Sequence, residues 1–409
     1  MNPDHFARLL YQGRGLPYLI LRDQPTDQYN SVLLNACLYN PVYNPQCEPD
    51  RAEYYHAIIS QTPDPAWFEQ QIVDALNDPD DEMDLDLLCD FALIYAKHGN
   101  VHARRLLYEI CNEYAALGET IGARQIVTLD GVAGILHAAN QLGQAVMLDP
   151  ECVLFDFLYD QLQEHVTISV SDLCSQAGKH YPFVQHYFAH LDRLAQQQDQ
   201  KPRLNVDDQP FAVIQAQIDD LPLTQCRRWM RQAHDDDVLL AAHALLQATD
   251  SAQIKAYLMM FTLRRFPLDF HHLMPFLRHD DEWVVDRALE ALAYFEHETL
   301  RDLAIEFAQT DHVRYGLLLL VLNFQPADVQ WLKNLYQQAT DDERKHDMSF
   351  AIREIVAEHF MPETIPLLEL DFVAGVCSLC RGGVVALLQE HDAFASSLAA
   401  EYAFDVNAY

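Results

Sequence analysis

Lysine and arginine are scarce in this chain of 409 residues. The 27 basic residues stand against 61 acidic ones, which gives a formal net charge of −34, and both halves of the chain carry an excess of acids. A surface of that sign repels phosphate groups, because nucleic acids and anionic membranes are bound through cations that displace counterions. The composition therefore disfavours nucleic acid and membranes as partners and favours a basic protein.

Long apolar runs are absent as well. The longest uninterrupted apolar run without a charge, residues 316–322, is far shorter than the roughly 18 residues that a membrane span needs. The N-terminus lacks the basic and apolar regions of a signal peptide, and nine irregularly spaced cysteines do not form the pattern of a secreted disulfide framework. We expect a soluble, cytoplasmic protein with reduced thiols.

Glycine is sparse too, with 13 residues, and runs of Ala, Leu, Gln and Glu take its place. One stripe of apolar residues at helical spacing consists of Ala103, Leu106, Leu107, Ile110, Cys111 and Tyr114. A second stripe consists of Leu85, Leu88, Ala92 and Tyr95. Only residues 98–100, with Gly99 as a helix stop, separate the two stripes. The pattern predicts two antiparallel helices joined by a short turn.

The C-terminal half contains repeated pairs of short apolar segments. The first members of these pairs begin at Phe270, Thr299, Asp328 and Thr364. The second members are expected over residues 283–295, 313–324, 348–360 and 376–388. Each pair is too apolar on one face to stand alone, so stacking on its neighbours is what buries that face. The inward positions are predicted to include Leu289, Leu292, Leu318 and Leu322.

The turn and second helix of these units carry a family resemblance. Residues 279–292 combine an acidic turn with Val, Arg, Ala and Leu at helical spacing, residues 311–314 keep a Val-Arg pair, and residues 237–245 keep the apolar frame. Over about residues 235–390 the chain thus resembles HEAT repeats. The resemblance implies an all-α fold, an α-α superhelix of the armadillo type, and a stacking architecture that specifies no chemistry.

Three regions are expected along the chain. Residues 1–195 form a helical region with an irregular start, which is either a cap or a second helical array. Residues 196–210 are polar, contain two prolines and are typical of a linker or exposed loop. Residues 211–409 form the HEAT-like region.

An acidic window lies between Arg51 and Lys97, where residues 52–96 contain 11 acids and no Lys or Arg. It is either a docking patch for a basic partner or an acidic helix N-terminus capped by Asp84 or Asp86. A calcium loop is disfavoured, because Met83 and Cys89 stand where such a loop needs Gly and Glu. The partner-binding candidates are Asp78, Asp80, Asp81, Glu82, Asp84 and Asp86.

Other patterns give weaker indications of chemistry. Cys377 and Cys380 form a single C-x-x-C without a second pair of ligands, so we expect them to pack as small buried residues. His271, His272 and His279 fall in or near a repeat turn and are interpreted as turn residues rather than metal ligands. Arginines 227, 228 and 231 are expected to pair with nearby acids. No catalytic residue, metal or cofactor is expected.

These patterns favour a non-catalytic binding protein or scaffold that uses an extended acidic α-solenoid surface. Two alternatives stay open at this point. One is an inhibitor or immunity-type protein that sequesters a basic protein. The other is an enzyme, a lyase or a metal-dependent hydrolase, with a pocket between the two helical halves. The sequence leaves the partner and the oligomeric state open.

Overall fold

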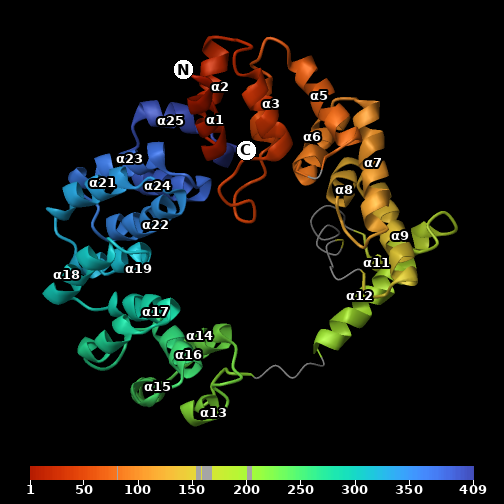
Figure 1. Ribbon diagram of the computed structural model, residues 1–409. Helices are drawn as coiled ribbons and strands as arrows, with labels where there is room; N and C mark the ends of the chain where they lie inside the picture. Colours follow the sequence, from red (N-terminus) through yellow and green to blue (C-terminus); the bar gives the residue numbers. More distant parts are fainter. Residues whose placement is uncertain (81, 153–157, 159–167, 200–204) are drawn as a thin grey trace. The chain divides into compact units, whose positions relative to one another are not determined.

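The computed structural model describes residues 1–409 except 81, 153–157, 159–167 and 200–204. All regular structure in the described part is helical, and no β-strand occurs there (Figure 1). The expectation of an all-α protein is therefore confirmed. Within the described ranges, no helix is both long and apolar enough to cross a membrane.

The chain divides into two compact units. Unit 1 comprises Met1–Pro202 together with Ser396–Tyr409, and unit 2 comprises Arg203–Ala395. Residues 396–409, which the sequence places with the C-terminal region, thus belong to the first unit. Helix structure also continues to Asp199, inside the expected linker of residues 196–210, and residues 205–210 are the part of that segment described without a helix.

Unit 1 is a double row of short helices. Its elements are α1 (Pro3–Gln12), α2 (Leu16–Asp23), α3 (Asn30–Tyr39), α4 (Ala52–Ile59), α5 (Pro65–Asn77), α6 (Leu85–Lys97), α7 (Val101–Ala115), α8 (Ala123–Asp130), α9 (Val132–Leu148), α11 (Val170–Ala177), α12 (Val184–Asp199), α25 (Ser396–Tyr402) and the 3-10 turn η4 (Val406–Ala408). Helices α1, α3, α5, α7 and α9 pack in succession, and α2, α4, α6 and α8 form the second row. Each helix therefore contacts the next but one along the chain, as stacked helix pairs do.

The predicted helix pair over residues 85–115 illustrates how the local sequence builds this unit. The side chain of Asp84 accepts a hydrogen bond from Leu87 N and starts α6, and Asn100 starts α7 in the same way through Ala103 N. Gly99 between them has a φ of +98°, which favours glycine. Of the ten predicted stripe residues, eight are buried, and the exceptions Leu85 and Tyr114 are partly buried. The predicted helices and the turn between them are confirmed.

The C-terminal segment packs on the first two helices of unit 1. Glu401 accepts hydrogen bonds from Arg14 Nε and Nη2 at 2.6 and 2.7 Å, and both side chains are buried. Val406 N donates to the carbonyl oxygen of Gly13 at 2.9 Å. Gly15 is required for this approach, because a Cβ there would overlap the Glu401 carbonyl oxygen. Both chain ends therefore contribute to the same unit.

Unit 2 contains the repeated pairs. Its elements are α13 (Phe211–Gln215), α14 (Leu223–Gln232), α15 (Asp235–Gln247), α16 (Ser251–Phe261), η1 (Phe270–His272), η2 (Met274–Arg278), α17 (Glu282–Leu292), α18 (Glu298–Phe307), α19 (Val313–Leu318), α20 (Leu320–Asn323), α21 (Asp328–Gln338), α22 (Asp342–Glu358), η3 (Pro362–Thr364), α23 (Ile365–Ala374) and α24 (Ser378–Glu390). Helices α14, α16, α17, α19, α22 and α24 pack in succession, with α21 against α23 beside them.

Unit 2 differs from the sequence expectation in several details. The helix expected over residues 348–360 begins six residues earlier, as α22 (Asp342–Glu358). The segment from Phe270 forms 3-10 turns rather than an α-helix, because Pro275 lacks the N–H that a continuous helix would need. The expected helix over 313–324 is interrupted at Leu319, whose N–H bonds to Gly316 O in a tighter turn. The predicted inward face of this segment was wrong, because the buried stripe consists of Val313, Gly316, Leu317 and Leu320, whereas Leu318 is only partly buried and Leu322 is 40% exposed. Residues 317, 319 and 320 supply the buried leucines instead.

Candidate binding pocket

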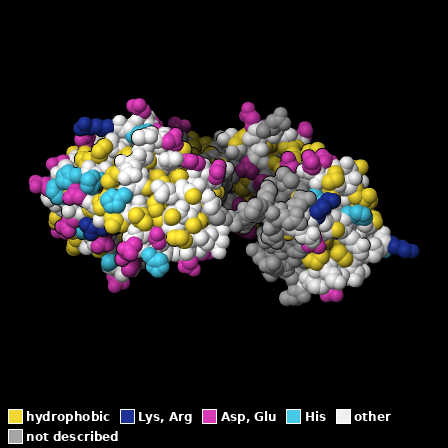
Figure 2. All heavy atoms as spheres, turned by 90° about the horizontal axis from the view of Figure 1, so that it is seen from below, with side chains coloured by type: hydrophobic (Ala, Val, Ile, Leu, Met, Phe, Trp, Pro, Cys, Tyr) yellow, Lys and Arg dark blue, Asp and Glu magenta, His cyan; other side chains and the backbone are white. Residues whose placement is uncertain are grey.

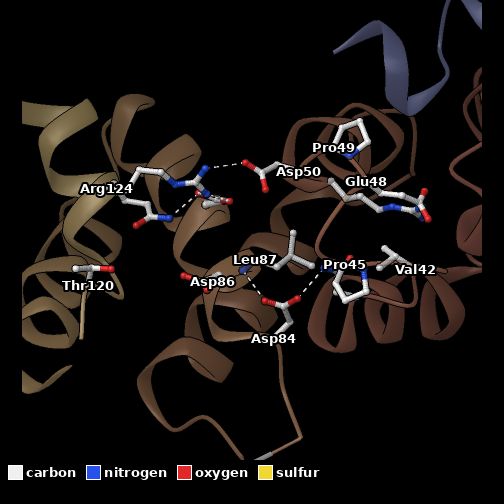
Figure 3. A pocket seen from close by; sticks show the side chains of 14 residues that line it. Val42, Pro45, Glu48, Pro49, Asp50, Asp84, Asp86, Leu87, Thr120 and Arg124 are labelled. Carbon is white, nitrogen blue, oxygen red and sulfur yellow. Dashed lines mark hydrogen bonds and ion pairs between the residues drawn. The ribbon is translucent and has the colours of Figure 1, made fainter. Parts of the chain in front are cut away.

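A pocket of about 370 Å³ in unit 1 has five acidic side chains among its 14 lining residues (Figure 3). Its walls come from the end of α3, the loop over 40–51, the first half of α6 and the start of α8. The lining residues are Asn40, Val42, Pro45, Glu48, Pro49, Asp50, Arg51, Asp84, Asp86, Leu87, Asp90, Thr120, Arg124 and Gln125. Segments far apart in the sequence therefore meet here.

The start of α6 positions the acids on one side. Asp84 Oδ1 caps the helix through Leu87 N, and Asp84 Oδ2 accepts a hydrogen bond of 2.6 Å from Asn40 Nδ2 at the end of α3. Asp84 N also donates to Leu38 O at 2.9 Å. Asp86 and Asp90 follow on the same helix, one turn apart, so that both lie on one face. The cap fixes where α6 begins and therefore where the carboxylates of Asp86 and Asp90 lie along the pocket wall.

Arg124 at the start of α8 bridges two acids across the pocket. Its guanidinium donates to Asp50 Oδ2 at 2.8 Å and to both oxygens of Asp90 at 2.8 and 3.0 Å. Gln125, which is 1% exposed, adds a bond of 2.7 Å from Nε2 to Asp90 Oδ1. Figure 3 shows the guanidinium of Arg124 pointing toward Asp50, with a dashed line between them. These hydrogen bonds from Arg124 and Gln125 hold the Asp90 carboxylate in place.

The surrounding protein favours the neutral form of two of these acids. Loss of water around Asp90 raises its pKa to about 6, despite the opposing effects of Arg124 and the Gln125 hydrogen bond. For Asp86, partial desolvation and then the neighbouring Asp84 carboxylate raise the pKa, although the residue keeps an exposed surface. Each ionised carboxylate in the pocket repels the negative charge of its neighbours and makes their ionisation less favourable. A bound cation would relieve that repulsion.

Asp86 is the carboxylate of the pocket that the described residues leave without a partner. Gln125 and Asn40 also line the pocket, and their side-chain oxygens are buried without a hydrogen-bond partner among the described residues. Asp86 makes no hydrogen bond or ion pair with any residue that the structure describes. The second arginine of the lining, Arg51, is directed elsewhere and donates to Leu10 O, Tyr11 O and Glu48 Oε2. Such an arrangement suits a ligand that is positively charged and carries N–H donors.

The six predicted partner-binding residues divide into two groups. Asp84 and Asp86 line the pocket. Asp78 at the end of α5, Asp80 and Glu82 are exposed outside it, with Asp80 accepting a hydrogen bond from Tyr39 Oη, and Asp81 lies outside the described residues. The predicted helix cap at Asp84 is present, and the interpretation of the window as a docking patch stays a prediction.

Four pocket residues were not identified from the sequence. Asp90 belongs to the acidic window and lies one helical turn after Asp86, a spacing that indicates a shared face. Asp50, Arg124 and Gln125 carry no local signal, because they join the site only through packing of the 40–51 loop and α8 against α6. Three residues of the pocket, Asp50, Asp90 and Arg124, also line a neighbouring hollow of about 330 Å³, together with Tyr409.

The other candidate residues have mainly structural partners. Arg228 pairs with Asp207, as expected for that arginine, and Trp229 Nε1 donates to Gln209 O at 2.8 Å. His271 contacts Asp269, and His279 Nδ1 accepts from Asp281 N in the repeat turn. In the part of the chain that the structure describes, one group of His, Cys, Asp or Glu side chains converges closely enough to hold a metal ion, and it consists of His346, Cys377 and Cys380.

Acidic side chains are prominent on the molecular surface. On the face drawn in Figure 2, Asp and Glu side chains are seen much more often than Lys and Arg. No protein family, curated protein or solved structure matches this chain.

Proposed function

We propose that this protein is a non-catalytic binding protein or scaffold for a basic protein, and that the acidic pocket of unit 1 accepts a lysine or arginine side chain of that partner. The observation that carries the proposal is a pocket with four aspartates, one of which, Asp86, has no hydrogen bond or ion pair among the described residues. An ammonium or guanidinium group supplies both the charge and the N–H donors that these carboxylates accept.

The charge of the whole chain supports the same partner. A net charge of −34 attracts a cationic protein over distances comparable to the Debye length of about 8 Å at physiological ionic strength. Such attraction mainly raises the association rate, whereas contacts inside a pocket slow dissociation. The acidic surface and the acidic pocket thus contribute to different steps of binding.

The architecture supports an extended binding surface. Rows of helix pairs in each unit are the construction of α-solenoids, which bind other macromolecules along their surfaces. The turn patterns near His279 and Asp311 support the resemblance to HEAT repeats in unit 2. All nine cysteines are free thiols, which supports a reducing compartment such as the cytoplasm.

Binding explains the pocket better than catalysis does. A raised carboxylate pKa near neutrality is typical of an acid catalyst, and Asp90 has one. Both oxygens of Asp90 are, however, engaged by Arg124, and one also by Gln125, so this carboxylate is positioned for structure rather than for proton transfer. Ion-pair networks of this kind perturb pKa values without any catalytic role.

The test uses a defined cationic probe. A fluorescent arginine-containing peptide is titrated with the full chain at two salt concentrations, and its anisotropy gives the dissociation constant. Asp86→Asn should weaken binding about tenfold, the equivalent of roughly 1.4 kcal/mol, because it removes the open carboxylate. Asp27→Asn is the matched control, because Asp27 is an exposed aspartate of unit 1 outside the pocket and this substitution removes the same charge.

Equal weakening by Asp86→Asn and Asp27→Asn would show that the pocket has no special part in binding. A loss that is specific to Asp86→Asn and persists at high salt supports the pocket. The alternative of a sequestering, inhibitor-type protein makes a different prediction for the natural partner. Purification from the source would then yield one cationic protein in equimolar amount, whereas a scaffold would yield several.

A further inference from the structure

Unit 2 contains a buried group of two cysteines and a histidine, here called the Cys-His cluster: His346, Cys377 and Cys380. Their ligand atoms all lie within 4.8 Å of one another. Cys380 Sγ is 3.5 Å from His346 Nδ1. The two cysteines are 4% and 5% exposed, and the histidine is partly buried. The two thiols and the imidazole therefore meet in a site largely closed to water.

Two packed helices bring these side chains together. Cys377 precedes the first residue of α24 and Cys380 lies in its first turn, so the C-x-x-C spacing places both sulfurs at one helix end. His346 lies near the start of α22, which packs against α24. The sequence supplied only the cysteine pair, and the third ligand comes from a residue 31 positions before Cys377. Only the packing of α22 on α24 places it there.

The distances fit a tetrahedral zinc ion. Zinc binds cysteine sulfur at about 2.3 Å and histidine nitrogen at about 2.0–2.1 Å, which puts neighbouring sulfur and nitrogen ligands about 3.5 Å apart. The separation between Cys380 Sγ and His346 Nδ1 is 3.5 Å. Two sulfur ligands of such an ion lie about 3.8 Å apart, so the limit of 4.8 Å for the whole cluster requires a closure of about 1 Å at most.

The surroundings of the cluster are polar, unlike those of cysteines packed as small apolar residues. Arg353 Nη2 donates to Cys380 Sγ at 3.6 Å from the same helix as His346. Between these two residues on α22, Ser349 donates to the buried Asp371 at 2.6 Å, and Tyr336 donates to the other oxygen of Asp371 at the same distance. Hydrogen bonds to metal-bound thiolates from groups such as Arg353 orient the ligands in metal sites.

We propose that His346, Cys377 and Cys380 bind a zinc ion. On binding, the two thiols lose their protons to solvent, and two zinc–sulfur bonds and one zinc–nitrogen bond replace the bonds from hydrated Zn²⁺ to all but one of its water ligands. Two thiolates and a neutral imidazole balance the charge of Zn²⁺, so the complex can remain buried. The three residues supply three of four tetrahedral positions, and water takes the fourth, as in zinc sites with an open position. The ion joins α22 to α24.

Metal content tests the proposal on the full chain. The protein is purified with a non-thiol reductant, equilibrated with Zn²⁺, freed of excess metal and analysed for zinc. We expect one zinc per wild-type chain and at least a tenfold lower affinity in Cys380→Ser and His346→Gln. Cys226→Ser is the matched control, because Cys226 is a buried cysteine of unit 2 outside the cluster. It should keep the wild-type zinc content.

A cobalt spectrum keeps the test decisive if a variant fails to fold. Co²⁺ bound by two thiolates and an imidazole gives tetrahedral ligand-field bands and a thiolate-to-cobalt charge-transfer band in the wild-type chain. Three results would overturn the proposal. They are wild-type protein that retains no zinc after equilibration with Zn²⁺, a cobalt spectrum without these bands, and unchanged zinc affinity in folded Cys380→Ser. A disulfide between Cys377 and Cys380, detected by mass spectrometry, that forms in the presence of equimolar zinc would overturn it as well.

Discussion

Asp84 and Asp86 lie two residues apart in the acidic window and have different roles. Asp84 is committed to structure, since its two oxygens accept hydrogen bonds from Leu87 N and Asn40 Nδ2. Asp86 has no such partner among the described residues and faces the pocket. A sequence pattern treats these neighbours alike, whereas the hydrogen bonds separate a helix cap from a candidate ligand-binding group.

Asp84→Ala should lower the free energy of unfolding of unit 1 by about 1 kcal/mol, because α6 loses its cap. Asp84→Asn should cost much less, since asparagine caps helices about as well as aspartate. Urea denaturation followed by circular dichroism gives both values. Equal costs for the two variants would mean that the charge of Asp84, and not its cap, supports the fold.

Asp90 provides a prediction on pH. Its pKa is raised to about 6 in the folded chain, above the ordinary value of about 3.9 in the unfolded chain. The folded state therefore binds the proton more tightly, and the contribution of Asp90 to stability is present below about pH 4 and is lost as the pH rises to about 6. Wild type should lose up to about 2 kcal/mol relative to Asp90→Asn across this window.

Urea denaturation of both proteins at pH 4, 5, 6 and 7 checks this difference. Comparing wild type with Asp90→Asn removes the contribution of the many other carboxylates, which titrate in both proteins. A stability difference that stays constant from pH 4 to pH 7 would contradict the raised pKa.

Helices α19 and α20 show that an apolar run does not by itself define a buried face. Residues 316–322 are all apolar, and the residues that become buried include Val313, Gly316, Leu317 and Leu320, at a helical spacing that continues past the turn at Leu319. Leu322 lies on another face and is 40% exposed, while Leu292 on α17 is fully buried, as predicted. The pattern identified the buried face where charged residues mark the opposite face, and failed where every side of the helix is apolar.

Leu292→Ala should destabilise unit 2 by about 2–5 kcal/mol, because it leaves a cavity in the packed row of helices. Leu322→Ala removes the same atoms from an exposed position and should cost about 0.5 kcal/mol. Thermal and urea unfolding of the two variants give the comparison. Similar losses for both leucines would show that Leu322 is buried in solution and that the predicted inward face was right.

At the scale of the whole molecule, the chain leaves unit 1 at residue 202 and returns to it at residue 396. The return is secured by the buried pair of Arg14 and Glu401 and by the bond from Val406 N to Gly13 O. Tyr409 at the end of this segment lines the hollow next to the acidic pocket. The last residues therefore contribute to the environment of the candidate site.

Glu401→Gln should destabilise unit 1 by about 3–5 kcal/mol, because it removes the carboxylate that balances a buried arginine. Hydrogen exchange should accelerate in α1, α2 and α25 and stay unchanged in α22 and α24 of unit 2. Glu390→Gln, an exposed glutamate of unit 2, serves as the control. Uniform acceleration in both units would show that they unfold together.

Much of the fold was predictable from the sequence because helices depend on residues three and four apart. The stripes on α6 and α7, the cap at Asp84 and the turn at Gly99 are all local patterns, and the structure contains each of them. The acidic window likewise follows from composition alone.

The sites depended on contacts between residues far apart in the chain, which only tertiary packing decides. Arg124 reaches Asp90 across 34 positions, and His346 reaches Cys380 across the same number. Arg14 and Glu401 are 387 positions apart. No local spacing encodes such pairs, because the side chains meet only after each helix has buried its apolar face against another helix.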